Sequence, residues 1–456
     1  MESYHQIILM SYGDDLNVIK TQNATENNVN IIKARLHSII NNKYEKDDEG
    51  YAFFREENSS YISKIVIYKE KKIIHTIVKE NGYFDNYPIT YINSNILNMD
   101  YKNITLYEIE KMVAGEYITP ETVSKFVSAR PNNNYTESRI RILKRLINIF
   151  IMSKEEQRKI ILKDTGKNCL MWIGALCFLF PVKLAHDISF NSLSDGIDNS
   201  FDINCVKEKN DITLSLYVEN ESKYYIHDLI EGLESKPKLD TRYANLAQIG
   251  YTISYDNIKA VTNFMDKFQY FNIRQDIDDC YNLYSFIYTM SSTEAERIIK
   301  GIEFLDKYGD RQVKYGIINI LELRITSNIC MISNEVALAF IDLMHDVSEG
   351  YNDDKFYKKS FRFLAMYINE LTIMRKYMRI EDVVNFFEKV YYKNRDKREL
   401  IIRYLLGKAN ANYIKRYIED DRLIDVYSMI INIIGNDGED AEWYVKALIE
   451  SRPRTI

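Results

Sequence analysis

Residues 158–192 read RKIILKDTGKNCLMWIGALCFLFPVKLAHDISFNS, and this stretch decides how the first half of the chain folds. The short run Ile160–Leu162 predicts a strand, a helix follows as far as Pro181, and Ile188–Phe190 predicts a second strand. Because Cys169–Phe180 carries no charge, this helix is apolar on every face. Such a helix must be buried on all sides. We therefore expect it to form the centre of a strand, helix, strand core.

The composition is that of a globular protein, with 46% hydrophobic and 28% charged residues. A chain of 456 residues is too long for one hydrophobic core, so we expect roughly two to four domains. The net charge of −6 argues against general binding to nucleic acid, because phosphate neutralisation needs a basic surface. The abundance of Ile, Asn, Lys and Tyr fits an AT-rich genome as well as it fits any function.

Cysteine usage and the absence of targeting segments predict a cytoplasmic protein. The five cysteines are odd in number and form no CxxC pair, which indicates neither a zinc site nor a disulfide framework. The N-terminal sequence MESYHQIILMSYGDD lacks the basic region and cleavage site of a signal peptide. The longest uncharged apolar run, Cys169–Val182, is too short to cross a bilayer core of roughly 30 Å. We expect no membrane partner.

Strand-like runs alternate with helical patterns up to about Lys238, which predicts an α/β or α+β first half. The expected strands are Ile7–Met10, Tyr51–Arg55, Ile62–Tyr68, Ile73–Val78 and Ile212–Val218, and the expected helices in this half are Asn28–Ile40 and Ser138–Phe150. The third and fourth strands read as a hairpin. The best linker is Gly232–Asp240. We accordingly expect an α+β domain over residues 1–100, an α/β domain over 101–235 and an all-helical domain over 241–456.

Beyond Thr241 the strand signal almost disappears and helical patterns recur. The expected helices are Asn257–Phe268, Thr293–Tyr308, Gln312–Arg324, Asn334–Asp346, Phe356–Met378, Ile380–Tyr392, Arg398–Leu406, Asn412–Glu419, Arg422–Ile434 and Ala441–Ile449. Capping signatures open several of them, for example Ser333-Asn-Glu335. Short polar joints favour antiparallel helix pairs. No repeat consensus is visible, so an irregular HEAT- or TPR-like stack is a hypothesis about architecture.

No catalytic or metal-binding motif is present in the sequence. The segment DTGKN, Asp164–Asn168, lacks the first glycine of a phosphate-binding loop, because Ile161 stands at that position. A turn between strand and helix is the simpler interpretation, although the helix N-terminus could hold an anion. The six histidines include no pair at the i, i+4 spacing of a helical zinc site. We expect no cofactor and no metal.

Two basic stretches are candidate interaction sites. The first runs from Arg139 to Arg145 and the second is the segment YYKNRDKRE from Tyr391. Tyrosines interleaved with cations can stack on bases, but carboxylates interrupt the second stretch, and a solvated helix end is the simpler interpretation. The candidate interaction residues are Arg139, Arg141, Lys144, Arg145, Tyr391, Tyr392, Lys393 and Arg395.

The central segment resembles the middle domain of the bacterial GTPase-associated protein family. That domain carries a strand, a helix with a Trp-Ile pair that ends at a proline, and a strand of the form Ile-Ser-Phe. Trp172, Ile173, Pro181 and Phe190 stand in these places and are the expected core residues. His5-Gln6 and the hairpin agree with the family's type-two N-terminal domain, so the resemblance covers roughly residues 4–206. Family members are inferred to act as adaptors beside a GTPase in prokaryotic conflict or defence systems.

Three hypotheses about function follow. The first is a non-enzymatic adaptor that binds a protein partner, such as a GTPase or another defence component, through the helical half. The second is an enzyme whose active site has no motif and uses His5, His75, His186 and Asp187, which would have to meet in one pocket. The third is a nucleic-acid sensor that acts through Arg139–Arg145 or Tyr391–Arg398. A continuous basic stripe would favour the third.

Overall fold

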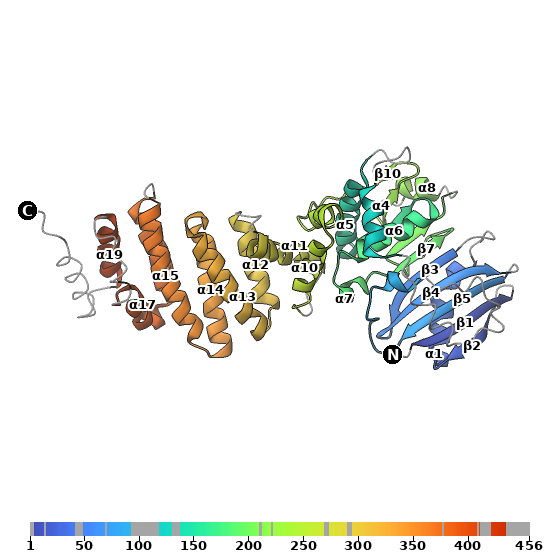
Figure 1. Ribbon diagram of the computed structural model, residues 1–456, viewed down its shortest axis with the longest axis horizontal. Coiled ribbons are helices and arrows are strands. Elements are labelled where there is room, and N and C mark those ends of the chain that lie inside the picture. The colour runs from blue at the N-terminus through green and yellow to red at the C-terminus, as the bar shows by residue number, and fades with distance from the viewer. Residues whose placement is uncertain are drawn as a thin grey trace, which may run out of the picture. The chain divides into compact units, whose positions relative to one another are not determined.

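The computed structural model folds into two compact units (Figure 1). One unit comprises Met1–Asp266 with Asn272–Ile277, and the other comprises Lys267–Phe271 with Asp278–Ile456. The structure describes residues 4–12, 15–41, 49–68, 71–92, 118–129, 137–208, 212–219, 222–268, 273–289, 294–375, 378–407, 410 and 421–434. A mixed sheet lies in the first unit and a helical array in the second, which confirms the expected fold class.

The first unit contains a ten-stranded sheet in the order β10-β9-β6-β8-β7-β3-β4-β5-β1-β2. The strands are β1 (His5–Tyr12), β2 (Asp15–Gln22), β3 (Glu49–Glu56), β4 (Ser59–Tyr68), β5 (Lys71–Lys79), β6 (Lys159–Lys163), β7 (Phe190–Ser194), β8 (Ile203–Val206), β9 (Tyr224–Asp228) and β10 (Leu233–Glu234). Strands β1–β5 are antiparallel, and β6–β9 pair in parallel. The two halves join where Phe53 of β3 pairs with Phe190 of β7.

The antiparallel half has the expected hairpin, in which β4 pairs with β5 from Ser60↔Lys79 to Tyr68↔Lys71. On one face its apolar side chains pack against α1 (Glu26–Arg35) and α2 (His37–Asn41). The predicted helix over this region is therefore divided at Leu36. Thr25 begins α1 with a capping box, in which Thr25 and Asn28 satisfy each other's backbone amides. Strand β2 was not predicted.

The parallel half contains the uncharged helix and its flanking strands, which begin within residues 158–192. Strand β6 leads into α6 (Gly166–Cys177), then into α7 (Val182–Ala185) and β7. The run Cys169–Phe180 is buried except for Met171, which is half-buried, as its composition predicted. The crossovers β6-α6-β7 and β8-α8-β9 run in opposite directions along the sheet, so their right-handedness places α6 and α8 on opposite faces.

One predicted strand is a helix. Ile212–Val218 lies in α8 (Ile212–Glu219), although its alternating pattern is typical of a strand. Parallel neighbours need a long crossover connection, usually a helix, and α8 supplies part of the one between β8 and β9. Leu216 packs on Ile161, Val206 and Ile226, so burial against the sheet overrides the local β preference.

The end of α6 is stabilised by tyrosine hydroxyls. The last carbonyl groups of a helix have no partner within it, and here the surrounding side chains are apolar. Tyr251 donates to the Ala175 carbonyl at 2.8 Å, and Tyr87 donates to the Phe180 carbonyl at 2.9 Å. Tyr243 donates to the carbonyl of Leu179. Two segments distant in sequence, one at Tyr87 and one over Tyr243–Tyr251, are thereby tied to the end of α6 and the residues just after it.

The predicted linker Gly232–Asp240 belongs to the sheet unit. Its residues Leu233 and Glu234 form β10, and the Ser235 amide donates to the Ile226 carbonyl at 2.8 Å. Just beyond it, Thr241 donates its hydroxyl to Asn148 Oδ1 at 2.7 Å. The division between the units instead falls around residues 266–278.

The remaining helices of the first unit surround this core. They are η1 (Pro88–Ile92), α4 (Pro120–Ser128), α5 (Arg139–Glu155), α9 (Asn245–Gln248), η3 (Ile249–Ile253) and α10 (Asp256–Met265). Helix α4 was not predicted, and it crosses α6 closely: a Cβ atom on Gly174 would lie 2.8 Å from Ile118 Cγ2, just before α4. Glycine permits this approach.

The second unit is an array of helices that pack mainly on near neighbours in sequence (Figure 1). After α11 (Ile273–Tyr284) and η4 (Ser285–Thr289) they are α12 (Ala295–Tyr308), α13 (Arg311–Ser327), η5 (Ile329–Met331), α14 (Asn334–Tyr351), α15 (Lys355–Met374), α16 (Ile380–Lys393), η6 (Arg395–Lys397), α17 (Arg398–Leu405) and α19 (Asp421–Ile434). Helix α11 was not predicted. The helices predicted at Asn412–Glu419 and Ala441–Ile449 lie outside the described residues.

Candidate protein-binding groove

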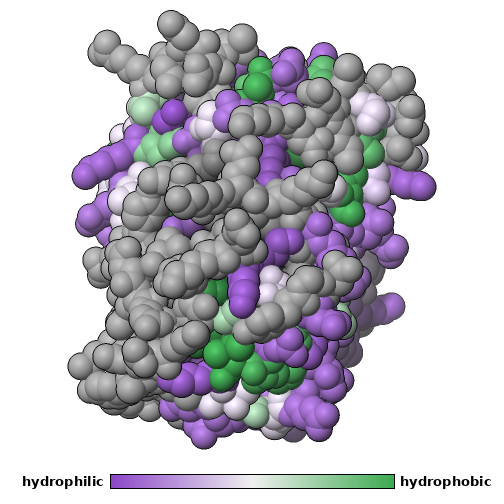
Figure 2. Space-filling model, turned by 90° about the vertical axis from the view of Figure 1, so that its right-hand side faces the viewer, coloured by the Kyte–Doolittle hydropathy of each residue, from purple (hydrophilic) through white to green (hydrophobic). Residues whose placement is uncertain are grey.

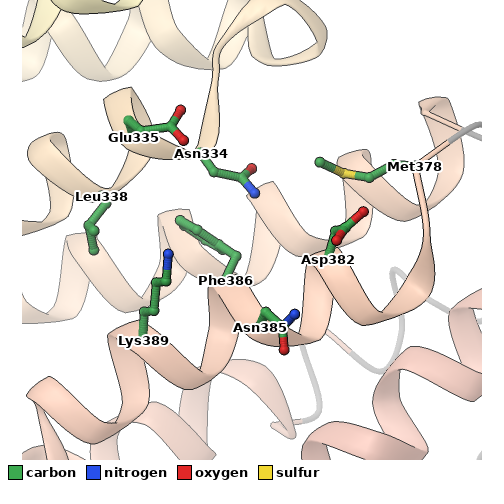
Figure 3. Close-up of a pocket in the computed structure, with 8 residues that line it drawn as sticks. All are labelled: Asn334, Glu335, Leu338, Met378, Asp382, Asn385, Phe386 and Lys389. Atoms are coloured by element: carbon green, nitrogen blue, oxygen red, sulfur yellow. The ribbon is translucent and has the colours of Figure 1, made fainter.

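A groove of about 310 Å³ opens on the helical unit between α14 and α16 (Figure 3). Its α14 wall consists of Asn334, Glu335 and Leu338. Its α16 wall consists of Asp382, Asn385, Phe386 and Lys389, and Met378 lies at the end where α16 begins. We refer to these eight residues as the α14–α16 groove.

The α14 wall begins at a capped helix end. The Ser333 hydroxyl accepts a hydrogen bond from the Val336 amide at 3.4 Å, as the capping signature predicted. The pKa of Glu335 is lowered by its own backbone amide, by Ser333 and by the positive charge of Lys389. Glu335 is therefore ionised at neutral pH.

The floor of the groove is aromatic. Phe386 is 3% exposed, and its ring centroid lies 5.1 Å from that of Tyr367 on α15. Phe363 continues the stack, 5.7 Å from Tyr367. The Tyr367 hydroxyl lies 3.0 Å from both Asn334 Oδ1 and the Ile332 carbonyl oxygen, so these two acceptors share its one hydrogen.

The α16 wall presents three polar side chains on one face of the helix. Asp382, Asn385 and Lys389 follow one another at i, i+3 and i+7, so all three lie on one face of the helix. Asp382 pairs with Arg379 at 3.3 Å, and the Arg379 side chain is 76% exposed. An exposed pair of this kind contributes about 0–1 kcal/mol, so Asp382 can exchange Arg379 for another cation.

The groove therefore combines the half-buried apolar side chains of Leu338 and Met378, above buried Phe386, with two amides and with charges of both signs. Buried apolar surface supplies binding energy, and a few placed polar groups supply orientation. Amide side chains carry a donor and an acceptor, which match the groups of a peptide backbone. This arrangement suits the binding of a polypeptide segment.

The second predicted basic stretch is divided by the structure. Tyr391 is 3% exposed and packs in the core, stacked on Phe387, whereas Tyr392 is 60% exposed. Lys393 pairs with Asp342 at 2.7 Å, and Arg395 is exposed. The stretch does not present its tyrosines and cations together.

The first basic stretch is used largely within the sheet unit. Arg139 is buried, and its guanidinium lies 4.1 Å from the centroid of the Phe126 ring. Arg145 pairs with both Glu137 and Glu234. Arg141 is exposed and Lys144 half-buried. Two of the four cations are thus neutralised or covered, which argues against the nucleic-acid hypothesis.

The enzyme hypothesis requires His5, His75, His186 and Asp187 to meet in one pocket, but these residues bond to different neighbours. His5 lies 3.2 Å from Glu80, and His75 lies 3.0 Å from Gln6 Oε1. Burial lowers the pKa of His75 to about 3.

His186 and Asp187 lie at the end of α7. His186 Nδ1 is 2.6 Å from the Val182 carbonyl, and burial lowers the pKa of this histidine to about 4. Asp187 pairs with Arg55 at 3.3 Å, and its pKa is raised by burial. His186 and Asp187 thus bond to other neighbours than His5 and His75 do. No hydrogen bond or ion pair among the described residues joins the four side chains of the enzyme hypothesis into one site.

The turn at Asp164–Asn168 is filled by its own side chains. Asp164 Oδ1 accepts hydrogen bonds from the Thr165 amide at 2.7 Å and from Asn168 Nδ2 at 3.2 Å. Its Oδ2 accepts from Trp172 Nε1 at 2.7 Å. Asp164 therefore ties the turn to Trp172 in the core of α6.

The carboxyl end of the parallel strands, where open α/β sheets bind ligands, is also occupied. Lys163 and Asp228 form an ion pair at 3.3 Å, with side chains 1% and 0% exposed. Thr213 donates to the same carboxylate. These buried polar groups satisfy one another.

The expected core residues lie in the interior. Trp172 and Phe190 are 0% exposed and Ile173 is 1% exposed, and Pro181 is buried. Figure 2 shows that hydrophilic side chains predominate among the coloured residues of one face, with only small hydrophobic areas. Over the ranges that the structure describes, no helix has the length and apolarity to cross a bilayer. Within those same ranges, no three His, Cys, Asp or Glu side chains come together as metal ligands.

Comparison with known proteins adds no relative. The sequence matches no protein-family model and no curated protein. The function of the groove is therefore inferred from its lining residues alone.

Sequence reasoning did not identify the residues of the α14–α16 groove. They come from two helices and lie about 50 positions apart in the sequence, and each helix alone shows an ordinary amphipathic pattern. The available signal was the polar spacing at positions 382, 385 and 389, combined with the packing of α14 and α16 on the helix between them, α15.

Proposed function

We propose that this protein is a non-enzymatic adaptor that binds a protein partner through the α14–α16 groove. The observation that carries the proposal is the groove itself, in which exposed Asn385 and Lys389 share the lining with the half-buried apolar side chains of Leu338 and Met378. An apolar floor with a polar rim is the usual anatomy of a protein-binding surface.

The resemblance of residues 4–206 to the GTPase-associated family supports the finer part of the proposal. On that basis the partner is a GTPase or another component of a prokaryotic conflict or defence system, and the adaptor acts in the cytoplasm. The segment Asp164–Asn168, which has a single glycine, agrees with a role that does not include nucleotide hydrolysis by this chain. Phosphoryl transfer needs backbone donors, a lysine and a metal around the phosphate.

The test has two parts. Purified protein is assayed for GTP and ATP hydrolysis, and tagged protein is purified from the organism that encodes it. We expect no turnover, and we expect co-purification of a partner that also binds the purified chain directly. Turnover that disappears in Lys167→Ala would overturn the adaptor proposal in favour of the enzyme.

A further inference from the structure

Strand β2 gives the sheet of the first unit a long exposed edge. The sheet ends on one side at β10, which has two residues, and on the other side at β2, which has eight. Among the described residues β2 pairs only with β1, and Figure 1 shows it at the outer edge of the sheet. None of its residues is buried, and Val18 is 45% exposed. The backbone N–H and C=O groups of an edge strand can pair with a further strand.

The two faces of β2 differ in chemistry. Residues paired across an antiparallel ladder share a face, and Val18 lies opposite Leu9, a residue of the core beneath α1 and α2. Leu16 packs against the same core. The other face of the strand carries polar residues, Asp15, Asn17 and Lys20. A strand added at this edge therefore meets an apolar row on one face and a charged row on the other.

A bulge interrupts β2 near its middle. Leu9 of β1 pairs with Val18, and the preceding residue, Ile8, pairs with Lys20, so Ile19 is the extra residue. A bulge and a lysine at an edge discourage pairing with an arbitrary strand. They favour a strand that carries the same bulge and the opposite charge at the matching position.

The sequence of β2 is complementary to itself in the antiparallel direction. With Ile19 set aside as the bulge residue, the strand reads Asp-Leu-Asn-Val-Lys. Asp15 then lies opposite Lys20 of a second copy. Leu16 lies opposite Val18, and Asn17 lies opposite its own counterpart. Opposite charges directly across a ladder are stabilising and like charges are destabilising, and two-fold symmetry repeats each contact.

We infer that two copies of this chain pair through β2, antiparallel and about a two-fold axis, so that their sheets become continuous. The occupant of the edge is a second copy because the order of charged, apolar and amide side chains matches itself. The contact uses other residues than the α14–α16 groove and does not depend on the proposed function. A pair of short strands buries little area, so we expect a dimer whose population rises with protein concentration.

The inference is tested by charge exchange in the full chain, with self-association measured by sedimentation velocity over roughly 1–200 µM. The wild type should show a monomer–dimer equilibrium. Asp15→Lys and Lys20→Asp each place like charges opposite each other in both symmetric contacts, and each should weaken self-association by about tenfold. An equimolar mixture of the two variants should associate about as strongly as the wild type, because each contact then joins a lysine to an aspartate.

The matched control is Glu296→Lys, which exchanges the charge of an exposed residue on α12 that pairs with Lys300 at 2.9 Å. It should leave self-association unchanged, and the melting transition of every variant shows whether it is folded. If a single variant unfolds, the double variant Asp15→Lys with Lys20→Asp decides, since it keeps the pairing and should associate as the wild type does. A wild type that stays monomeric over the whole range overturns the inference. So does a dimer that the single exchanges leave unchanged or that the mixture does not restore.

Discussion

Acidification from pH 7 to pH 5 should destabilise the sheet unit strongly, because this unit buries neutral histidines. His75 and His227 are 3% and 0% exposed, and desolvation lowers the pKa of each from 6.5 to about 3. In the unfolded chain the same side chains bind a proton near pH 6.5. The stabilisation is therefore complete above pH 6.5 and is lost as the pH falls toward the folded-state pKa.

The magnitude follows from the pKa difference. pH 5 is about 1.5 units below the pKa of a histidine in the unfolded chain. Each buried histidine therefore lowers the free energy of unfolding by about 2 kcal/mol, at roughly 1.4 kcal/mol per unit. His75 and His227 together cost about 4 kcal/mol. His186, whose pKa is lowered to about 4 by burial, adds a similar amount. Since domains are stable by about 5–15 kcal/mol, the loss should be large.

The assay is urea denaturation at pH 7 and pH 5, followed by circular dichroism, for the wild type and His227→Phe. Neither ring nitrogen of His227 has a hydrogen-bond partner, so the substitution strands no buried group. It should remove about 2 kcal/mol of the pH dependence. His37→Gln, at an exposed position, is the matched control. Equal free energies of unfolding at the two pH values would refute the reasoning.

Four further substitutions test the packing and the buried ion pair. Trp172→Ala empties a fully buried site and should lower the free energy of unfolding by about 3–5 kcal/mol, with a fall in soluble yield; unchanged melting would show that the core is misplaced. Gly174→Ala should lower the free energy of unfolding by about 1–3 kcal/mol through overpacking. Gly316→Ala on α13, with no atom within 4 Å of the added Cβ, should instead stabilise the protein by about 0.5–1 kcal/mol. Similar melting temperatures for the two variants would contradict this. Asp228→Asn leaves Lys163 buried without its charge partner and should cost about 3–5 kcal/mol, so thermal denaturation indistinguishable from the wild type would show that the pair is unimportant.

The elements that were predicted correctly are those whose sequence pattern agrees with their environment. The uncharged run Cys169–Phe180 has only one stable environment, a buried helix, and β4 and β5 alternate or carry β-branched residues at the core. The helices of the second unit have apolar faces with the helical period. In each case local preference and tertiary burial favour the same structure.

The errors arose where the environment was decided by distant residues. ITLSLYV at Ile212–Val218 has the alternation of a strand, but the connection between β8 and β9 requires a crossover. Gly232–Asp240 has linker composition, yet part of it pairs with β9. The α14–α16 groove depends on two helices meeting, and a single helix carries no sign of its partner.

The measurement that tests the central claim most directly is the affinity of the purified partner for this chain. Isothermal titration calorimetry compares the wild type with Asn385→Arg, which places a large cation in the groove, and with Lys300→Met as the control on α12. The account predicts that Asn385→Arg loses binding by at least about tenfold, or roughly 1.4 kcal/mol, while Lys300→Met binds as the wild type does. Equal affinity of all three folded proteins would contradict the assignment of the groove as the binding site.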